Sequence, residues 1–524
     1  MYTGNVVEIP IGSEGLTGSK NPSGVHPGYL IEANNVSFYD GTLRKEGGAA
    51  KYNATAITGA PTILGGFDHR TNSLAQRMVV ATSAGQLLKD SGTGTFPVIL
   101  KTGLGGAYNP YFVQGGKEAA AGSRKLFIFT GSNPVQVLAD DGATTANLSI
   151  PASDWTGAQQ PTFGFIHNYR LLAGGNSSDP HRIYYSTITN QEDFTGTGSG
   201  TLAVYPGEGD ALVGGISFNN FAVVFKRPAG IYIIDMREPN SANWTVQRIN
   251  RAIGLASPWA LVQTDLDVIF IDTVGNVQSL TNSLSNVEVE GRNLDQDAFL
   301  EPLLRTEFDL GRLSSIKGVY YVARREVHFA YTRPGSIVNN SRLVLDLYRP
   351  DKIRYRLSPR DVCEALWIRR DANGIGRVMV GDNAGFVWQL DQASRNKAGA
   401  GYVSRATTVP TDFGFANPDL AHRVKNAEFL ELVYEPTSFN NVIVTAIWDG
   451  KPRQVLSFAL RSSGAVLGST FILGNAILGS SGYVPTRKRL LGGGKFLSLS
   501  FTNTSPNQDF SIARARVYFN PANE

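Results

Sequence analysis

Cysteine is almost absent from this sequence. The single residue of this type among 524 is Cys363, so no intrachain disulfide can form, which excludes the small disulfide-stabilised scaffolds typical of secreted proteins. Cys363 lies in the alternating stretch VCEALWI. That pattern predicts a small core residue rather than a reactive nucleophile.

Charge and long apolar runs are also scarce. Charged residues make up 18% of the chain, the net charge is +4, and no apolar run reaches the roughly 18 residues that a membrane helix needs. We therefore expect no membrane-spanning segment. The start, MYTGNVVEIPIG, lacks the basic and apolar regions of a signal peptide. Basic residues cluster only briefly, at 369–370 and 487–489, which predicts solvated surface rather than a nucleic-acid-reading face.

Sequence motifs for catalysis and metal binding are missing. There is no P-loop, no HExxH and no GxSxG, and one cysteine cannot form CxxC. The histidines have no metal-ligand spacing; they are His26, His69, His167, His181, His328 and His422. The sequence therefore predicts no catalytic, cofactor-binding or metal-binding residues and no cofactor.

A few polar clusters are candidates for catalytic or binding sites, but their sequence context favours structural roles. Asp179 and His181 flank Pro180 and predict a hydrogen-bonded turn, and His328 in EVHFAY is expected to point off a strand face. The paired carboxylates suit acid–base chemistry in principle, but they fit better as a turn and a helix N-cap; they are Asp140-Asp141 and Asp295 with Asp297. An active site assembled from distant loops stays open as an alternative.

What the sequence does contain is turns and alternating strands. Glycine contributes 57 residues. In residues 218–235, FNNFAVVFKRPAGIYIID, two alternating apolar runs are separated by Pro228-Ala229-Gly230. Alternation with period two around a Pro/Gly break predicts a β-hairpin.

The same pattern recurs at a nearly constant spacing. Seven segments begin near Ile63, Pro110, Pro161, Gly209, Trp259, Ser314 and Asp361, in steps of 47 to 55 residues. Four short strands per unit at this period are typical of a β-propeller. We therefore predict an all-β chain with a six- or seven-bladed propeller. A large irregular β-sandwich is the alternative.

The flanking regions predict further parts. Residues 1–58 are expected to form an extended arm with one hairpin turning at 39–41, and residues 59–395 the propeller, with a helical insertion near 293–312. The longer strands of residues 401–524 predict a C-terminal antiparallel β-sandwich. Its Gly-rich loop, 464–494, and the arm are the segments expected to bind neighbouring subunits.

Four stretches resemble one family of phage proteins. They are residues 33–53 (ANNVSFYDGTLRKEGGAAKYN), 223–235 (VVFKRPAGIYIID), 253–280 (IGLASPWALVQTDLDVIFIDTVGNVQSL) and 378–391 (VMVGDNAGFVWQLD). Together they resemble the tail nozzle or head-closure hub proteins of short-tailed bacteriophages, which include the packaged-DNA stabilisation proteins. The likeness covers residues 30–395.

This resemblance implies a structural virion protein of the tail that is not an enzyme and is assembled in the host cytoplasm. It would form a ring, usually a homo-hexamer, below the portal and adaptor proteins and in contact with tail fibres or a needle. The ring would extend the head-to-tail DNA channel, retain packaged DNA without sequence specificity, and pass it at ejection.

Two other functions remain open at this stage. A propeller hydrolase or lyase acting on glycans would need a cluster of inward-facing carboxylates at the propeller centre. A glycan- or receptor-binding tail propeller would need aromatic pockets repeated in each blade.

Overall fold

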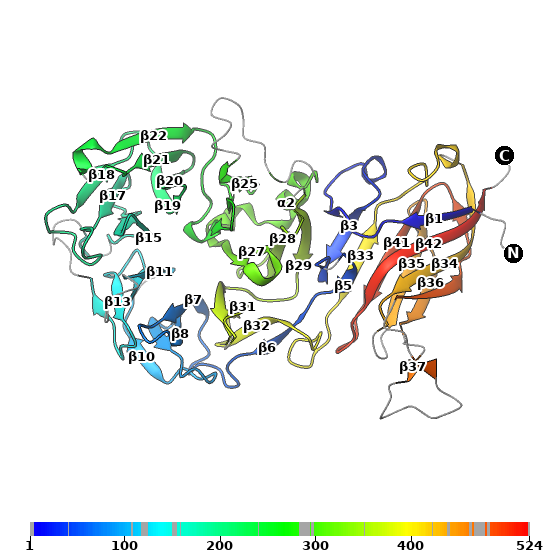
Figure 1. The fold of residues 1–524 in the computed structure, drawn as a ribbon, viewed down its shortest axis with the longest axis horizontal. Helices are drawn as coiled ribbons and strands as arrows, with labels where there is room; N and C mark the ends of the chain where they lie inside the picture. Colours follow the sequence, from blue (N-terminus) through cyan, green and yellow to red (C-terminus); the bar gives the residue numbers. More distant parts are fainter. Residues whose placement is uncertain are drawn as a thin grey trace.

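The computed structural model describes most of the chain (Figure 1). The described residues are 5–521, apart from 40, 106–107, 117–123, 149–154, 158, 239, 282–293, 295–297, 350–351, 372, 422, 437–440, 461–463, 466–476 and 479–482. Asp295, Asp297 and His422, and residues 466–476 and 479–482 of the Gly-rich loop predicted at 464–494, lie outside these residues. Every structural statement below concerns the described part.

Seven consecutive blades form the propeller. Five are separate four-stranded sheets, one has three described strands, and one is the four-stranded part of a ten-stranded sheet. The blades are β7 (Ile63–Arg70), β8 (Gln76–Thr82), β9 (Gln86–Lys89) and β10 (Val98–Lys101); β11 (Tyr111–Gly115), β12 (Lys125–Phe129), β13 (Gln136–Ala139) and β14 (Ala146–Asn147); β15 (Phe163–His167), β16 (Arg170–Gly174), β17 (Arg182–Tyr185) and β18 (Gly200–Ala203); β19 (Ala211–Phe218), β20 (Phe221–Arg227), β21 (Ile231–Asp235) and β22 (Thr245–Asn250); β23 (Leu261–Gln263), β24 (Val268–Ile271) and β25 (Val277–Ser279); β26 (Lys317–Tyr321), β27 (Glu326–Tyr331), β28 (Ser341–Asp346) and β29 (Arg354–Ser358); and β30 (Ala365–Arg370), β31 (Gly376–Gly381) and β32 (Val387–Gln392) with β6 (Gly48–Lys51).

The first strand of each blade begins within four residues of the start predicted from the sequence. The inner edges of the blades contact one another in sequence order around a ring, with β19 meeting the fifth blade at the 3-10 turn η3 (Pro258–Ala260), and the ring closes where β30 meets β7. The predicted hairpin at 218–235 is also confirmed, with β20 antiparallel to β21. The propeller is therefore the fold that the regular spacing indicated.

An N-terminal strand closes the ring. β6 pairs antiparallel with β32, so the last blade combines residues from both ends of the propeller region. Gly48 in β6 packs so closely that a β-carbon there would lie 2.4 Å from the carbonyl oxygen of Asn396. A side chain at this position would force the backbones apart.

The remaining strands form a two-sheet sandwich. Its strands are β1 (Asn5–Ile9), β2 (Gly15–Leu16), β3 (Tyr29–Asn34), β4 (Val36–Ser37), β5 (Leu43–Lys45), β33 (Ser404–Thr408), β34 (Lys425–Tyr434), β35 (Asn441–Trp448), β36 (Lys451–Ala459), β39 (Val484–Arg489), β40 (Gly493–Gly494), β41 (Leu497–Asn503) and β42 (Ser511–Pro521), with β37 (Gly464–Ala465) and β38 (Ile477–Leu478) paired beside it. A turn at Asp449-Gly450 joins β35 to β36, and both residues have positive φ, as a tight hairpin of this kind requires.

The N-terminal segment is extended, but it is built into the rest of the molecule rather than lying free as an arm. β1 pairs with β42 along five residues, and β3 lies between β29 of the propeller and β33 of the sandwich. The predicted hairpin is present as β4 and β5. The prediction of an arm available to neighbouring subunits therefore needs correction, because its strands complete sheets within the same chain.

The helical prediction at 293–312 is confirmed only in part. Helix α2 covers Glu301–Glu307, with Pro302 in its first turn. The end of the predicted range is not α-helical, because α2 stops at Glu307 and a separate 3-10 segment follows, η4 (Leu310–Ser315). The other 3-10 turns are η1 (Pro22–Gly24), η2 (Ser241–Asn243), η3 (Pro258–Ala260), η5 (Val322–Arg324) and η6 (Pro418–Leu420).

One apolar core is continuous between the propeller and the sandwich. It includes Phe329 and Leu343 of the β26–β29 blade, Leu304 of α2, and Val444 and Phe519 of the two sandwich sheets. One sheet also passes through both parts, in the order β26-β27-β28-β29-β3-β33-β41-β35-β36. Burial of shared apolar surface and a shared sheet make the two parts one elongated body (Figure 1).

We expect Gly48→Ala to destabilise the protein by about 1–3 kcal/mol, because the added methyl group overpacks the contact with Asn396. Thermal and denaturant unfolding measure this change. Gly105→Ala is the matched control, since a β-carbon at Gly105 meets nothing within 4 Å. Equal stability of the two variants would contradict the role given to β6.

Candidate functional site

Side chains cross the propeller axis at one end. The indole Nε1 of Trp259, in η3 before β23, donates to the carbonyl oxygen of Pro110 at 2.9 Å. Nζ of Lys317 in β26 donates to the Asn109 side chain at 2.9 Å and to the carbonyl oxygen of Leu64. These contacts join blades that are not neighbours, so they fix the blades across the centre.

Lys317 is the one strongly perturbed amine at this axis among the described residues. Burial lowers its pKa to about 8, and the charge of Glu364 opposes that shift only in part. Both hydrogen bonds use the ammonium as donor, and they occupy it with fixed acceptors. This geometry holds the lysine as a cross-link between blades.

Carboxylates are sparse at the centre. The seven inner strands contribute one, Asp68, whose side chain accepts a hydrogen bond from the backbone of Arg370 at 2.9 Å. Burial raises the pKa of Asp68. Glycoside hydrolysis needs two carboxylates facing each other, and the inner strands do not bring a second one to Asp68.

The weak candidates from the sequence take structural roles where they are described. Asp141 pairs with Arg77 and Lys89, and Asp140 accepts a hydrogen bond from the backbone of Asn72 at 2.6 Å. Asp179 pairs with Arg182 rather than with His181.

The other candidates are dispersed. His69 contacts Gln114, and His167 contacts Ser217. Cys363 is buried, as predicted, and burial raises its thiol pKa to about 12. Across the described residues, no group of three or more His, Cys, Asp or Glu could hold a metal ion, and no helix is long and apolar enough to cross a membrane.

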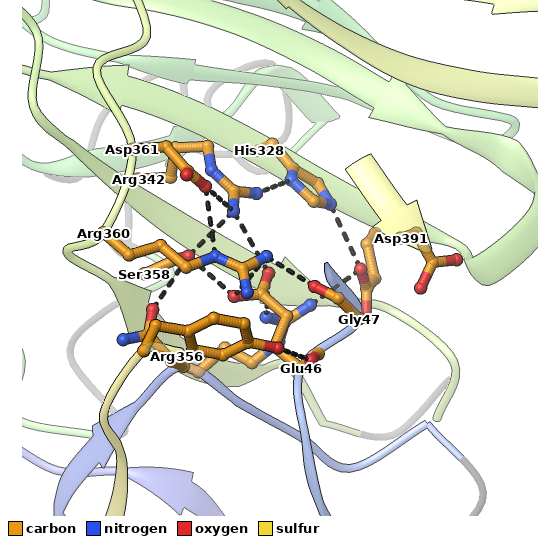
Figure 2. A network of polar contacts seen from close by, with 12 residues as sticks. Glu46, Gly47, His328, Arg342, Arg356, Ser358, Arg360, Asp361 and Asp391 are labelled. Carbon is orange, nitrogen blue, oxygen red and sulfur yellow. Dashed lines mark hydrogen bonds and ion pairs between the residues drawn. The ribbon is translucent and has the colours of Figure 1, made fainter. Parts of the chain in front are cut away.

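The densest polar site lies where the propeller meets the sandwich (Figure 2). It is built on one face of the β27–β29 sheet, where alternate residues of each strand point the same way. The residues on this face are Glu326, His328, Arg342, Asp346, Arg354, Arg356 and Ser358. All are buried. We call this group, together with Glu46, Arg360 and Asp361, the junction network.

Glu46 lies at the centre of the junction network. Its Oε1 accepts from Arg356 at 2.9 Å and from Arg342 at 3.3 Å, and its Oε2 accepts from the Ser358 hydroxyl at 2.6 Å. Arg360 lies 3.6 Å from the same carboxylate. Three guanidinium groups therefore surround one carboxylate.

Glu326 and His328 complete the buried arrangement. Arg356 donates to Glu326 at 2.8 Å. Nε2 of His328 lies 3.1 Å from the Glu326 carboxylate, and Nδ1 of His328 lies 2.9 Å from Arg342. An arginine can only donate, so Nδ1 accepts and Nε2 carries the proton. The imidazole is therefore in its neutral form in this arrangement.

Electrostatics keep these carboxylates ionised although they are buried. Burial alone would raise the pKa of Glu46, but Arg360, Arg342 and Arg356 bring it well below its usual range. Burial would likewise raise the pKa of Glu326, but Arg356 and the hydrogen bond from His328 lower it to about 2. Burial also lowers the pKa of His328.

The junction network holds both chain connections between propeller and sandwich. Glu46 lies on the first connection, between β5 and β6. On the second, between β32 and β33, Lys397 pairs with Asp361 at 3.2 Å, and the Tyr402 hydroxyl donates to the carbonyl oxygen of Glu46. Buried ion pairs contribute little net stability, but breaking one is costly and their geometry is specific. The network therefore fixes how the two parts meet.

The sequence contained a partial signal for this site. EVHFAY, SRLVLD and RYRLS each place polar side chains at alternate positions, which we interpreted for His328 as a residue pointing off a strand face. That orientation is correct, but the face is covered by Glu46, about 280 residues away in sequence. Nothing local to the three strands predicts such a cover.

Comparisons with known proteins identify no family for this chain. No family model matches this sequence, and no curated protein matches it. Similar solved structures include the computationally designed Ika8 protein (13% identity, TM-score 0.37, covering 72% of this chain and 99% of that one). Others are the WD40 β-propeller domain of Doa1 (8%, 0.40, 67% and 97%) and YCF48 bound to D1 peptide (12%, 0.39, 66% and 95%).

We expect Arg356→Met to cost about 3–5 kcal/mol of unfolding free energy, because it leaves two buried carboxylates short of a partner. Denaturant unfolding measures the loss. The control is Arg305→Met, which removes an exposed pair with Glu301 and should change stability by less than about 0.5 kcal/mol. A cost for Arg356→Met as small as that of the control would contradict the junction network.

A pH dependence follows from His328. Its folded pKa lies below the unfolded value of about 6.5, so the unfolded chain binds the proton first as pH falls. Below about pH 6.5 this group therefore reduces stability. His328→Gln keeps one donor and one acceptor but cannot titrate, so its unfolding free energy should fall less steeply between pH 7 and pH 5. The exposed His26, substituted in the same way, is the control. Identical slopes for wild type and His328→Gln would refute the assignment.

Proposed function

We propose that this chain is a structural subunit of the tail hub or nozzle of a short-tailed bacteriophage. In this role copies of the chain form a ring below the portal and adaptor proteins, retain packaged DNA and pass it at ejection. The observation that carries the proposal is the single rigid body made by the propeller, the sandwich and the junction network. A subunit that lines a duct for DNA under pressure must keep its shape.

The closed propeller axis supports a particular arrangement of the ring. Trp259 and Lys317 cross the axis and hold distant blades together, so a DNA duct must run between subunits rather than through a propeller. An elongated body with different surfaces at its two ends favours head-to-tail contacts, which close into a ring when the rotation per subunit is right.

The low charge of the chain is consistent with a duct that lets DNA slide. Phosphate contacts by Lys and Arg increase DNA affinity steeply, and here the net charge is +4 over 524 residues. Several arginines outside the junction also pair within the chain, such as Arg487 and Arg516 with Glu431. Charges already paired in this way leave less positive field for DNA.

Light scattering and negative-stain imaging of the purified chain test the proposal, alone and mixed with the portal and adaptor proteins of the same phage. We expect a ring of about six subunits with a central hole in at least the second condition. A chain that stays monomeric in both conditions and is absent from purified virions would contradict the proposal. Cleavage of bacterial surface glycans by the purified chain would favour the hydrolase alternative.

A further inference from the structure

An uncharged groove runs along the outer side of the propeller where the ring closes. It has a volume of about 620 Å³ and lies between β9 and β10 of the first blade and the segment that follows β6. Its lining includes Ile57, Leu88, Phe96 and Ile99 as apolar surface and the hydroxyls of Thr55 and Thr93. None of its lining residues carries a charge. Its size is within the range of roughly 300–1,000 Å³ found for ligand pockets.

The groove is held open by fixed contacts. The Asn53 side chain accepts from the backbone of Val387 at 2.7 Å and donates to the carbonyl oxygen of Gly385 at 3.0 Å, so one wall is tied to the last blade. On the other wall, the Ser91 hydroxyl contacts those of Thr93 and Thr95, both at 2.7 Å. Because the groove is already formed, binding of a partner loses no free energy in ordering its walls.

The groove leaves apolar surface open to solvent. The Ile99 side chain is 52% exposed, although it lies in the outermost strand of its blade beside Phe96 and Pro97. An occupant that matches these walls must be uncharged, largely apolar and able to accept or donate a few hydrogen bonds. The lining residues offer no charged group to pair with a phosphate or an acidic peptide.

One segment of this chain has that chemistry. Residues 462–486 contain no charged residue, and they include Val466, Leu467 and the run Phe471-Ile472-Leu473. Most of the segment lies outside the described residues, but β37 and β38 mark where it leaves the sandwich. In Figure 1, β37 lies below the sandwich and β10 at the lower edge of the propeller, with β32 and β6 between them. This placement favours a groove on another copy of the chain.

We propose that segment 462–485 of one subunit docks in this groove on the propeller of the next subunit. The inference rests on the ring proposed above and gives it a specific head-to-tail contact. Because the segment leaves the sandwich and the groove lies on the propeller, the same contact can repeat from subunit to subunit. Apolar side chains of the segment would cover Ile99 and Phe96, as the buried centre of an interface does.

Cross-linking between two differently tagged copies tests the docking. One copy carries Thr55→Cys in the groove and the other carries Ser469→Cys in the segment. A short bis-maleimide linker is used, since the buried Cys363 thiol with its raised pKa does not compete. We expect efficient joining of the two tags. Thr144→Cys, an exposed threonine of the second blade, is the control and should give at least about tenfold less product.

Further variants show whether the cross-link depends on the groove and on the segment. Ile99→Asp places a charge in the groove and should lower the yield of the cross-link about tenfold. The matched control is Ile188→Asp, an isoleucine of similar exposure at 49% in another blade, which should leave the yield unchanged. Replacing residues 466–476 by a short Gly-Ser linker should prevent ring closure.

The outcomes separate this inference from the proposed function. Rings that form normally without residues 466–476, or a cross-link insensitive to Ile99→Asp, would overturn the docking and leave the tail role intact. A cross-link that forms only between cysteines of the same copy would contradict the proposed contact between subunits. Loss of the cross-link on addition of free sugars would assign the groove to a glycan instead. A cross-link that behaves as expected in a chain absent from virions would keep the docking and contradict the tail role.

Discussion

The arrangement of this molecule depends on one buried carboxylate, Glu46, and the arginines around it. Arg342, Arg356 and Arg360 come from one blade and the loop that follows it, whereas Glu46 comes from the connection that enters the propeller from the sandwich. Three buried guanidinium groups without a carboxylate would be very unfavourable. The first connection can therefore take one position, and Tyr402 on the second connection is bound to the same residue.

Apolar packing and strand pairing around this network also hold the propeller and the sandwich together. The apolar core runs without a break from Phe329 in the propeller to Phe519 in the sandwich, and β3 lies between β29 and β33. Apolar burial supplies most of the stability, while the charges specify the angle at which the two parts meet. A propeller that is closed across its axis and joined rigidly to a sandwich is suited to building assemblies.

Local pattern and long-range pairing explain what the sequence could and could not predict. The alternation in residues 221–234 and the turn at Asp449-Gly450 fix strands by themselves, because each depends on neighbours a few residues apart. The regular spacing of turns then indicates the blades. By contrast, Glu8 lies opposite Arg516 and Glu46 covers His328 and its neighbours, and these contacts join residues hundreds of positions apart. For this reason the N-terminal strands were predicted as a free arm, and the buried network was missed.

Single-particle cryo-electron microscopy of the native chain assembled with portal and adaptor proteins would show whether the chain forms a ring of rigid subunits. We expect a closed ring in which every subunit keeps the propeller and the sandwich at the angle seen here, with Glu46 buried among its arginines. Subunits in which the two parts take variable angles, or an assembly without a ring, would contradict it.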